Sequence, residues 1–168
     1  MPKIIRDLES RLIEEARKQI EASGYSAMTV RSVANACGVG VGTVYNYFPS
    51  KDALLATYML QDWERCMTAI HAVSRYSDGP KPVARCMFDQ LLAYAELHQA
   101  ILRDEAAGAA FAGSFSRYHA VLREQLALPL RKFCRSDFAA EFIAECLLTW
   151  TMAGTDFDTL HEMVEKLF

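Results

Sequence analysis

Apolar residues recur at spacings of three and four along almost the whole chain, which is the spacing of one face of an α-helix. No segment alternates apolar and polar residues between the turn signals of a β-hairpin. A first predicted helix, from about residue 3 to Ala22, carries one apolar stripe made of Ile5, Leu8, Leu12, Ile13, Ala16 and Ile20. The pattern predicts an all-helical fold.

Capping residues, glycines and prolines divide this pattern into about nine helices. After the first, the predicted helices cover approximately residues 29–36, 40–47, 50–76, 82–97, 100–107, 114–134, 136–153 and 155–168. Thr29, Ser50 and Ser136 are the predicted N-caps of three of them, and Thr155 with Asp158 suggests a capping box for the last. Pro129 is expected to kink the helix that contains it.

Charge is unevenly distributed along the 168 residues, which carry a formal net charge of -3. Residues 1–51 are net +2, whereas residues 52–168 are net -5. A mildly basic head on an acidic body is expected if only the head approaches phosphate. We therefore predict a first domain over residues 1–49 and a second over residues 50–168.

The cysteines are odd in number and scattered, with no Cys-x-x-Cys pair among Cys37, Cys66, Cys86, Cys134 and Cys146. This pattern is typical of free, mostly buried thiols in a reducing compartment. The chain has neither a secretory signal pattern nor an uncharged apolar run of membrane-spanning length. We expect a cytoplasmic protein with no membrane partner.

Two short predicted helices near the N-terminus have the spacing of a helix-turn-helix. The two helices would be locked together by apolar Val33, Cys37, Val39, Val44 and Phe48, and small Ala34 would let them cross closely. Gly38 suits the turn because it adopts a left-handed backbone at least cost. The residues left facing outward, which we predict to contact DNA, are Thr29, Arg31, Val41, Gly42, Thr43, Tyr45, Asn46, Tyr47 and Lys51.

Those outward residues suit the chemistry of a DNA groove. Gly42 lets the backbone come close, Thr43 can hydrogen-bond or touch a thymine methyl, and Asn46 can pair with adenine. Phosphates are the expected partners of Thr29, Tyr47 and Lys51, and either guanine or a phosphate is the partner of Arg31. Tyr45 could belong partly to the core, although base contact is slightly favoured.

The run TVRSVANACGVGVGTVYNYFPSKDALL resembles the signature of the TetR family of one-component bacterial regulators. The resemblance covers residues 5–55 and implies a nine-helix homodimer, a palindromic operator in double-stranded DNA, and an unknown small-molecule inducer rather than a cofactor. It also implies phosphate contacts for Thr29, Tyr47 and Lys51, and base contacts for Gly42, Thr43, Tyr45 and Asn46. Val41 stands where many members have a polar residue, so no hydrogen bond is expected from it.

The body is rich in aromatic residues and methionines, most of which should be ordinary core. Some could line a ligand pocket, and the resemblance favours the fourth, fifth and seventh helices as its walls. The candidate pocket residues are Tyr58, Trp63, Met67, Phe88, Leu91, Tyr94, Phe111, Phe115, Tyr118 and Leu122. His98 and His119 lie on helices that could border such a pocket.

The last two predicted helices are very apolar. They either cover the core of their own chain or pair with a second copy in a four-helix bundle. We favour the dimer, because two heads about 34–36 Å apart can read a palindrome. The candidate interface residues are Phe138, Phe142, Ile143, Leu147, Trp150, Phe157, Leu160, Met163, Val164 and Leu167.

The sequence thus favours a DNA-binding repressor released by a ligand. A TetR-like coactivator or protein-interaction module is the alternative, although the retained groove-compatible residues argue against it. An all-helical enzyme ranks last, since no nucleophile with a base, no carboxylate pair and no metal-ligand spacing is visible.

Overall fold

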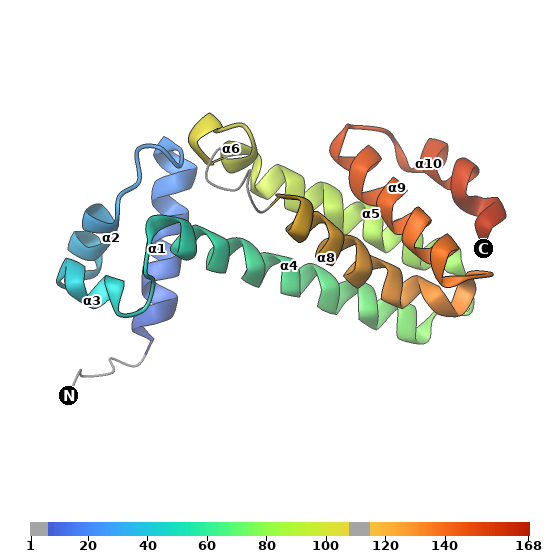
Figure 1. Cartoon of the computed structure of the whole chain (residues 1–168), viewed down its shortest axis with the longest axis horizontal. Coiled ribbons are helices and arrows are strands. Elements are labelled where there is room, and N and C mark those ends of the chain that lie inside the picture. Colours follow the sequence, from blue (N-terminus) through green and yellow to red (C-terminus); the bar gives the residue numbers. More distant parts are fainter. Residues whose placement is uncertain (1–6, 108–114) are drawn as a thin grey trace. The chain divides into compact units, whose positions relative to one another are not determined.

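The computed structural model in Figure 1 describes residues 7–107 and 115–168, without the side chains of residues 102 and 115–118. Within that part of the chain every regular element is a helix, which confirms the predicted fold class. None of the helices described there is both long enough and apolar enough to span a bilayer.

The chain packs as two compact units. In the described residues, the first unit comprises 7–62 with 98–107, and the second comprises 63–97 with 115–168. The helix α4, Lys51–Tyr76, contributes its first part to one unit and its remainder to the other. This division follows packing, and it lies elsewhere than the predicted functional boundary after residue 49.

The first unit contains α1 (Leu8–Ser23), α2 (Val30–Cys37), α3 (Val41–Tyr45) and α6 (Gln99–Leu102), with the beginning of α4. The predicted stripe of α1 is buried at each described position, from Leu8 to Ile20, and Ile5 lies outside the described residues. This stripe packs with Val33, Val44 and Tyr58 into one core. The core fixes α2 and α3 against α1.

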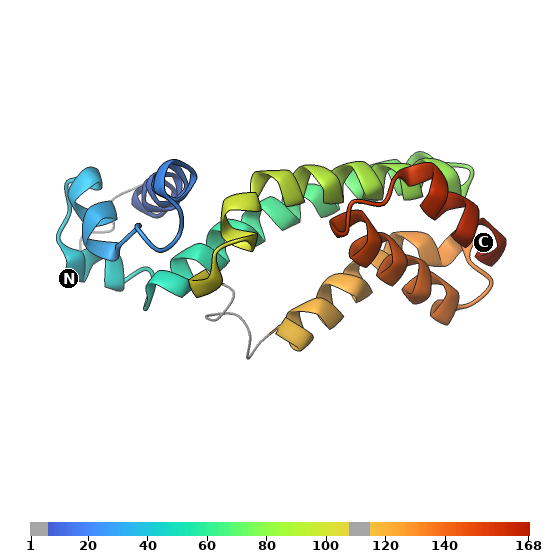
Figure 2. The same ribbon diagram turned by 90° about the horizontal axis from the view of Figure 1, so that it is seen from above.

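The second unit contains α5 (Pro80–Leu97), α8 (Phe115–Ala127), the 3-10 helix η1 (Leu128–Phe133), α9 (Asp137–Met152), α10 (Phe157–Val164) and η2 (Glu165–Leu167). The helices α8 and α9 run side by side in Figures 1 and 2, and α9 also packs on α5. Met87, Leu126, Ile143 and Leu147 are buried in its core.

Three predicted N-caps are confirmed. Thr29 accepts a hydrogen bond from the Ser32 amide at 3.0 Å, Ser50 from Ala53 at 3.0 Å, and Ser136 from Ala139 at 3.1 Å. These side-chain oxygens satisfy amides that have no partner inside their helices.

Four predicted boundaries were wrong. The structure ends α3 at Tyr45, since the chain must turn before Pro49, and it limits α6 to Gln99–Leu102. The last helix is capped by Asp156 rather than Thr155, through the Thr159 amide at 3.0 Å. Pro129 cannot donate to an α-helical carbonyl, so α8 ends at Ala127 and continues as η1 instead of kinking.

Candidate nucleic-acid interface

The turn between α2 and α3 is built on Gly38, which has φ 70° in the left-handed region. The Val39 amide donates to the Ala34 carbonyl at 3.0 Å and closes the end of α2. Ala34 is fully buried, so the backbones of the two helices can cross closely. The buried side chains of Val33, Val44 and Phe48 then hold the helix pair, as the sequence predicts.

A charged side chain of α1 reinforces the C-terminal end of α2. Arg11 donates from Nη2 to the Cys37 carbonyl oxygen at 3.0 Å, and the Cys37 thiol donates to the Arg11 carbonyl at 3.6 Å. A cation at a helix C-terminus also stabilises the helix dipole. The two helices are therefore joined by polar contacts as well as by their apolar core.

The N-terminus of α2 carries a reciprocal capping box. The Thr29 hydroxyl accepts from the Ser32 amide, and the Ser32 hydroxyl accepts from the Thr29 amide at 3.1 Å. Thr29 itself is exposed. The helix therefore presents a fixed threonine hydroxyl beside its positive end, which is suited to a phosphate.

The residues of α3 and its C-terminal turn form a small polar surface. Gly42, Tyr45 and Asn46 are exposed, with Tyr45 at 51% of its full exposure, and Thr43 is half-buried. Of the alternatives for Tyr45, the structure favours the outward one over the core. The backbone opposite Gly42 has open space, since a Cβ there would meet nothing within 4 Å. This face can approach a groove closely.

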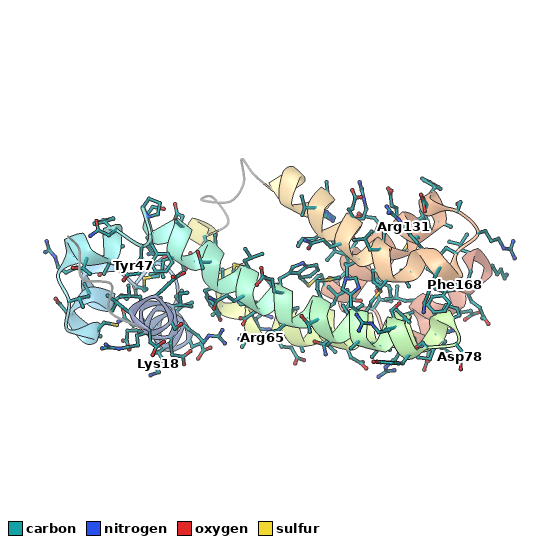
Figure 3. All side chains as sticks on the ribbon, turned by 90° about the horizontal axis from the view of Figure 1, so that it is seen from below. Lys18, Tyr47, Arg65, Asp78, Arg131 and Phe168 are labelled. Carbon is teal, nitrogen blue, oxygen red and sulfur yellow. The ribbon has the colours of Figure 1, made fainter. Side chains whose placement is uncertain are left out.

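Three other predicted contact residues flank this surface differently. Arg31 is exposed on α2, whereas Val41 and Tyr47 are half-buried and pack against the core of the first unit. Figure 3 labels Tyr47, whose ring lies 6.4 Å from that of Phe48. Packing of this kind restricts the Tyr47 side chain and so limits where its hydroxyl can lie.

Lys51 has partners that the sequence did not indicate. Its ammonium donates to the Tyr25 carbonyl at 2.5 Å and lies 3.9 Å from the centre of the Tyr25 ring. Burial lowers the pKa of Lys51 from its ordinary value. Tyr25 in turn donates its hydroxyl to Asp52, and burial together with that bond raises the pKa of Tyr25. The lysine thus fixes the loop before Thr29.

A buried charged cluster in the first unit was not predicted. Asp62 accepts from Arg17 Nη2 at 2.8 Å, and His98 Nε2 lies 3.1 Å from its second oxygen. The Tyr58 ring lies 4.9 Å from His98, and the Arg17 guanidinium lies 4.5 Å from the centre of that ring. His98 therefore belongs to this core. The sequence signal was an aspartate four positions after Tyr58, at the spacing of the buried face of α4, which is weak evidence by itself.

The candidate pocket residues fall into different places. Tyr58 is in the core of the first unit, and Trp63, Met67, Phe88 and Leu91 are buried in that of the second. Trp63 donates to Gln125 at 2.5 Å, while Tyr94 meets its ring edge-on and Leu122 is partly buried. Phe111 and the side chains of Phe115 and Tyr118 lie outside the described residues.

Two hollows in the second unit have other linings. One of about 370 Å³ is lined by Arg135, Ser136, Phe138, Ala139, Phe142, Lys166 and Leu167. The other, of about 540 Å³, is lined by His71, Ser74, Arg75, Leu128, Pro129 and Lys132. Of the predicted site residues whose side chains the structure describes, only the interface candidates Phe138, Phe142 and Leu167 line either of them.

The candidate interface residues are divided by their burial. Phe138 and Met163 are each 76% exposed, Trp150 and Phe142 are about half exposed, and Leu167 is partly buried. The remainder lie inside the core of their own chain and offer no surface to a partner: Ile143, Leu147, Phe157, Leu160 and Val164. On α9 the apolar residues extend beyond the buried face as far as the polar stripe of Asp137, Glu141 and Glu145, so hydrophobicity does not separate the buried set from the exposed one.

The five cysteines are free, as predicted, although only Cys37 is buried and the other four are partly buried. Burial raises the pKa of every one of these thiols. His119 lies 3.3 Å from Glu145, in an ion-pairing position. Among the described residues, no three metal-ligating side chains gather in one place.

The geometry of the first unit is that of a helix-turn-helix protein. The family model for the bacterial regulatory proteins of the tetR family matches residues 12–58. A transcriptional repressor KstR from Rhodococcus jostii is 33% identical over 58% of this chain and 46% of its own length. The uncharacterized HTH-type transcriptional regulator YuxN of Bacillus subtilis is 31% identical over 48% of this chain and 28% of its own length.

Solved structures match nearly the whole chain. GusR of Salmonella enterica superposes with a TM-score of 0.70 at 20% identity and covers 98% of both chains. The putative regulator SCO7518 of Streptomyces coelicolor has a TM-score of 0.72 at 13% identity and covers 95% of this chain and 97% of its own. Residues 12–58 therefore resemble the tetR family of bacterial regulatory proteins in sequence, and the chain as a whole shares the fold of these solved structures. The match spans less than half the length of KstR and of YuxN.

Proposed function

We propose that this chain is a transcriptional regulator that binds double-stranded DNA through α3 and the N-terminus of α2. The observation that carries the proposal is the exposed face of Gly42, Tyr45 and Asn46, held by a buried core beside the capped end of α2. Such a face can enter a major groove while Thr29 and Tyr47 contact phosphates. Repression is favoured because KstR, a relative in this segment, is a repressor.

The proposed regulator acts as a homodimer on a palindromic operator. Exposed Phe138, Phe142, Trp150 and Met163 supply an apolar surface on α9 and α10 that a second copy can cover. A small-molecule inducer would bind in the second unit and release the protein from DNA. This part of the proposal rests on the family resemblance alone. DNA binding by a bacterial regulator also implies a place in the cytoplasm.

A mobility-shift experiment tests DNA binding. The full chain would first select duplexes from a random-sequence pool, and the affinity for the selected duplex would then be followed with increasing salt. We expect a palindromic consensus and an affinity that falls steeply with salt, as phosphate contacts release counterions. Failure to retard any duplex at low salt would contradict the proposal and favour the protein-interaction alternative.

Three variants separate the proposed contacts. Tyr47→Ala should weaken binding to all duplexes, since its partner is a phosphate, whereas Asn46→Ala should mainly relax the preference at one base pair. Tyr76→Ala is the matched control, because Tyr76 is a strongly exposed tyrosine of the second unit. If Tyr47→Ala and Asn46→Ala change the base preference equally, the assigned roles are wrong.

A further inference from the structure

A chain of hydrogen bonds runs from α1 to the N-terminus of α2. Gln19 Nε2 donates to Glu15 Oε1 at 2.9 Å, and the Ser32 hydroxyl donates to Gln19 Oε1 at 2.5 Å. Ser32 is the residue that forms the capping box with Thr29. The exposed threonine is thus connected to α1 through a side chain that does not itself belong to the predicted DNA-binding set.

The partners fix the orientation of each group in this chain. A carboxylate only accepts hydrogen bonds, so the Gln19 amide must turn its NH₂ toward Glu15 and its oxygen toward Ser32. The Ser32 hydroxyl has one proton. When this proton is donated in a hydrogen bond to Gln19, the lone pairs of Ser32 remain to accept from the Thr29 amide and hydroxyl, each at 3.1 Å.

Without Gln19 the same proton has a local acceptor, the Thr29 carbonyl at 2.8 Å. That carbonyl already accepts from the Val33 amide at 3.1 Å. The capping box can therefore still form without Gln19, because all its partners lie within α2 and its cap, but it opens more readily once it is no longer held on α1. What would be lost is the polar connection that holds the capped end at one position on α1.

We propose that Gln19 is a positioning residue for DNA binding, which holds the Thr29 hydroxyl and the first turn of α2 against one phosphate. This inference rests on the proposed DNA-binding function. The side chain of Gln19 acts through Ser32 and touches no phosphate itself. A phosphate contact depends on placement within a few tenths of an ångström, since a hydrogen bond weakens quickly with distance and angle.

The test replaces Gln19 by methionine, which keeps the length of the side chain and removes its acceptor. We expect the affinity for the selected duplex to fall about fivefold, the effect of one hydrogen bond. Ser32→Ala should lower affinity as well, and adding Gln19→Met to Ser32→Ala should cause no further loss, because the connection is then already broken. Gln99→Met, at an exposed glutamine of α6, is the matched control and should bind normally.

A scan with single methylphosphonates distinguishes positioning from a general structural role. The phosphate that Thr29 contacts is identified first. Its replacement by a methylphosphonate weakens DNA binding by the wild type but not by Thr29→Val. In Gln19→Met the loss at that same phosphate should shrink, whereas the losses at other phosphates and the base preference stay unchanged. An unaltered profile, or equal changes at every phosphate, would overturn the proposal.

Hydrogen exchange of the free protein gives a readout that needs no DNA. The Thr29 and Ser32 amides should exchange faster in Gln19→Met than in the wild type, while amides in the middle of α1 should not change. Unchanged exchange would show that Gln19 does not hold the capped turn and would overturn the inference even if DNA binding stands. Failure of the wild-type chain to bind any duplex would instead overturn the proposed function, before any variant is compared.

Discussion

Replacing Asp62 by Ala removes the carboxylate that Arg17 and His98 share in the core of the first unit. The side chain of Asp62 is 2% exposed and that of His98 is fully buried, so water cannot replace the lost acceptor at His98. The Arg17 side chain is 18% exposed and can be partly hydrated again. The substitution therefore leaves the buried His98 ring and the partly hydrated Arg17 guanidinium without their main partner.

The expected cost follows from these contacts. Removing one partner of a buried ion pair costs about 3–5 kcal/mol, and the partial exposure of Arg17 favours the lower end, about 3 kcal/mol. Asp62→Asn has the same size and keeps one acceptor oxygen for Arg17, so about half that loss is expected. The matched control is Asp89→Ala, which breaks a half-exposed pair with Arg85 and should cost less than about 0.5 kcal/mol.

Equilibrium unfolding in urea, followed by far-ultraviolet circular dichroism at one fixed protein concentration, measures these differences. The order of stability should be wild type, Asp89→Ala, Asp62→Asn and Asp62→Ala, from most to least stable. A loss of less than about 1 kcal/mol for Asp62→Ala would refute the reasoning, since the removal of a buried carboxylate with two partners should destabilise the fold by more than that. An equal loss for Asp89→Ala would do the same.

Three further outcomes are expected. Gly38→Ala should lower the unfolding free energy by about 1 kcal/mol, because φ is +70°, and no more than that, because a Cβ would meet open space. Thermal denaturation would measure this loss. Hydrogen bonds from the Ala107 and Ser26 amides hold the pKa of Asp104 below its ordinary value of 3.8. The contribution of Asp104 to the unfolding free energy is therefore present above about pH 4 and is lost in acid. Urea unfolding as a function of pH should show a smaller loss of stability in acid for Asp104→Asn than for the wild type. Trp150→Ser should weaken self-association in analytical ultracentrifugation, and Tyr76→Ser should not.

The features that could be predicted from the sequence are those with local causes. Thr29 caps α2 because its hydroxyl reaches an amide three residues on, and Gly38 turns because it has no Cβ. The buried stripe of α1 follows in the same way from its spacing. The outward placement of Gly42, Tyr45 and Asn46 follows once the buried positions of α2 and α3 are known.

The features that could not be predicted depend on tertiary contacts. From the sequence, Lys51 is expected to be a surface lysine, and only the fold places it beside Tyr25. The partner of Asp62 is likewise visible only in the fold, because Arg17 is 45 positions away in the chain. On α9, both Ile143 and Trp150 are apolar, yet one is buried and the other is half exposed. Hydrophobicity alone does not say which helix face meets the core.

The second contribution to the first unit, residues 98–107, also changes how the protein could be dissected. Ile101 and Ala107 are buried in the same core as α1, and Asp104 accepts from the Ser26 amide at 3.1 Å just before Thr29. The polypeptide therefore passes from one unit to the other three times, after Asp62, before His98 and again before α8. A gene fragment cut after α3 or α4 would encode a head with part of its core missing, so a transplantable DNA-binding module must be assembled from two separate stretches of the gene.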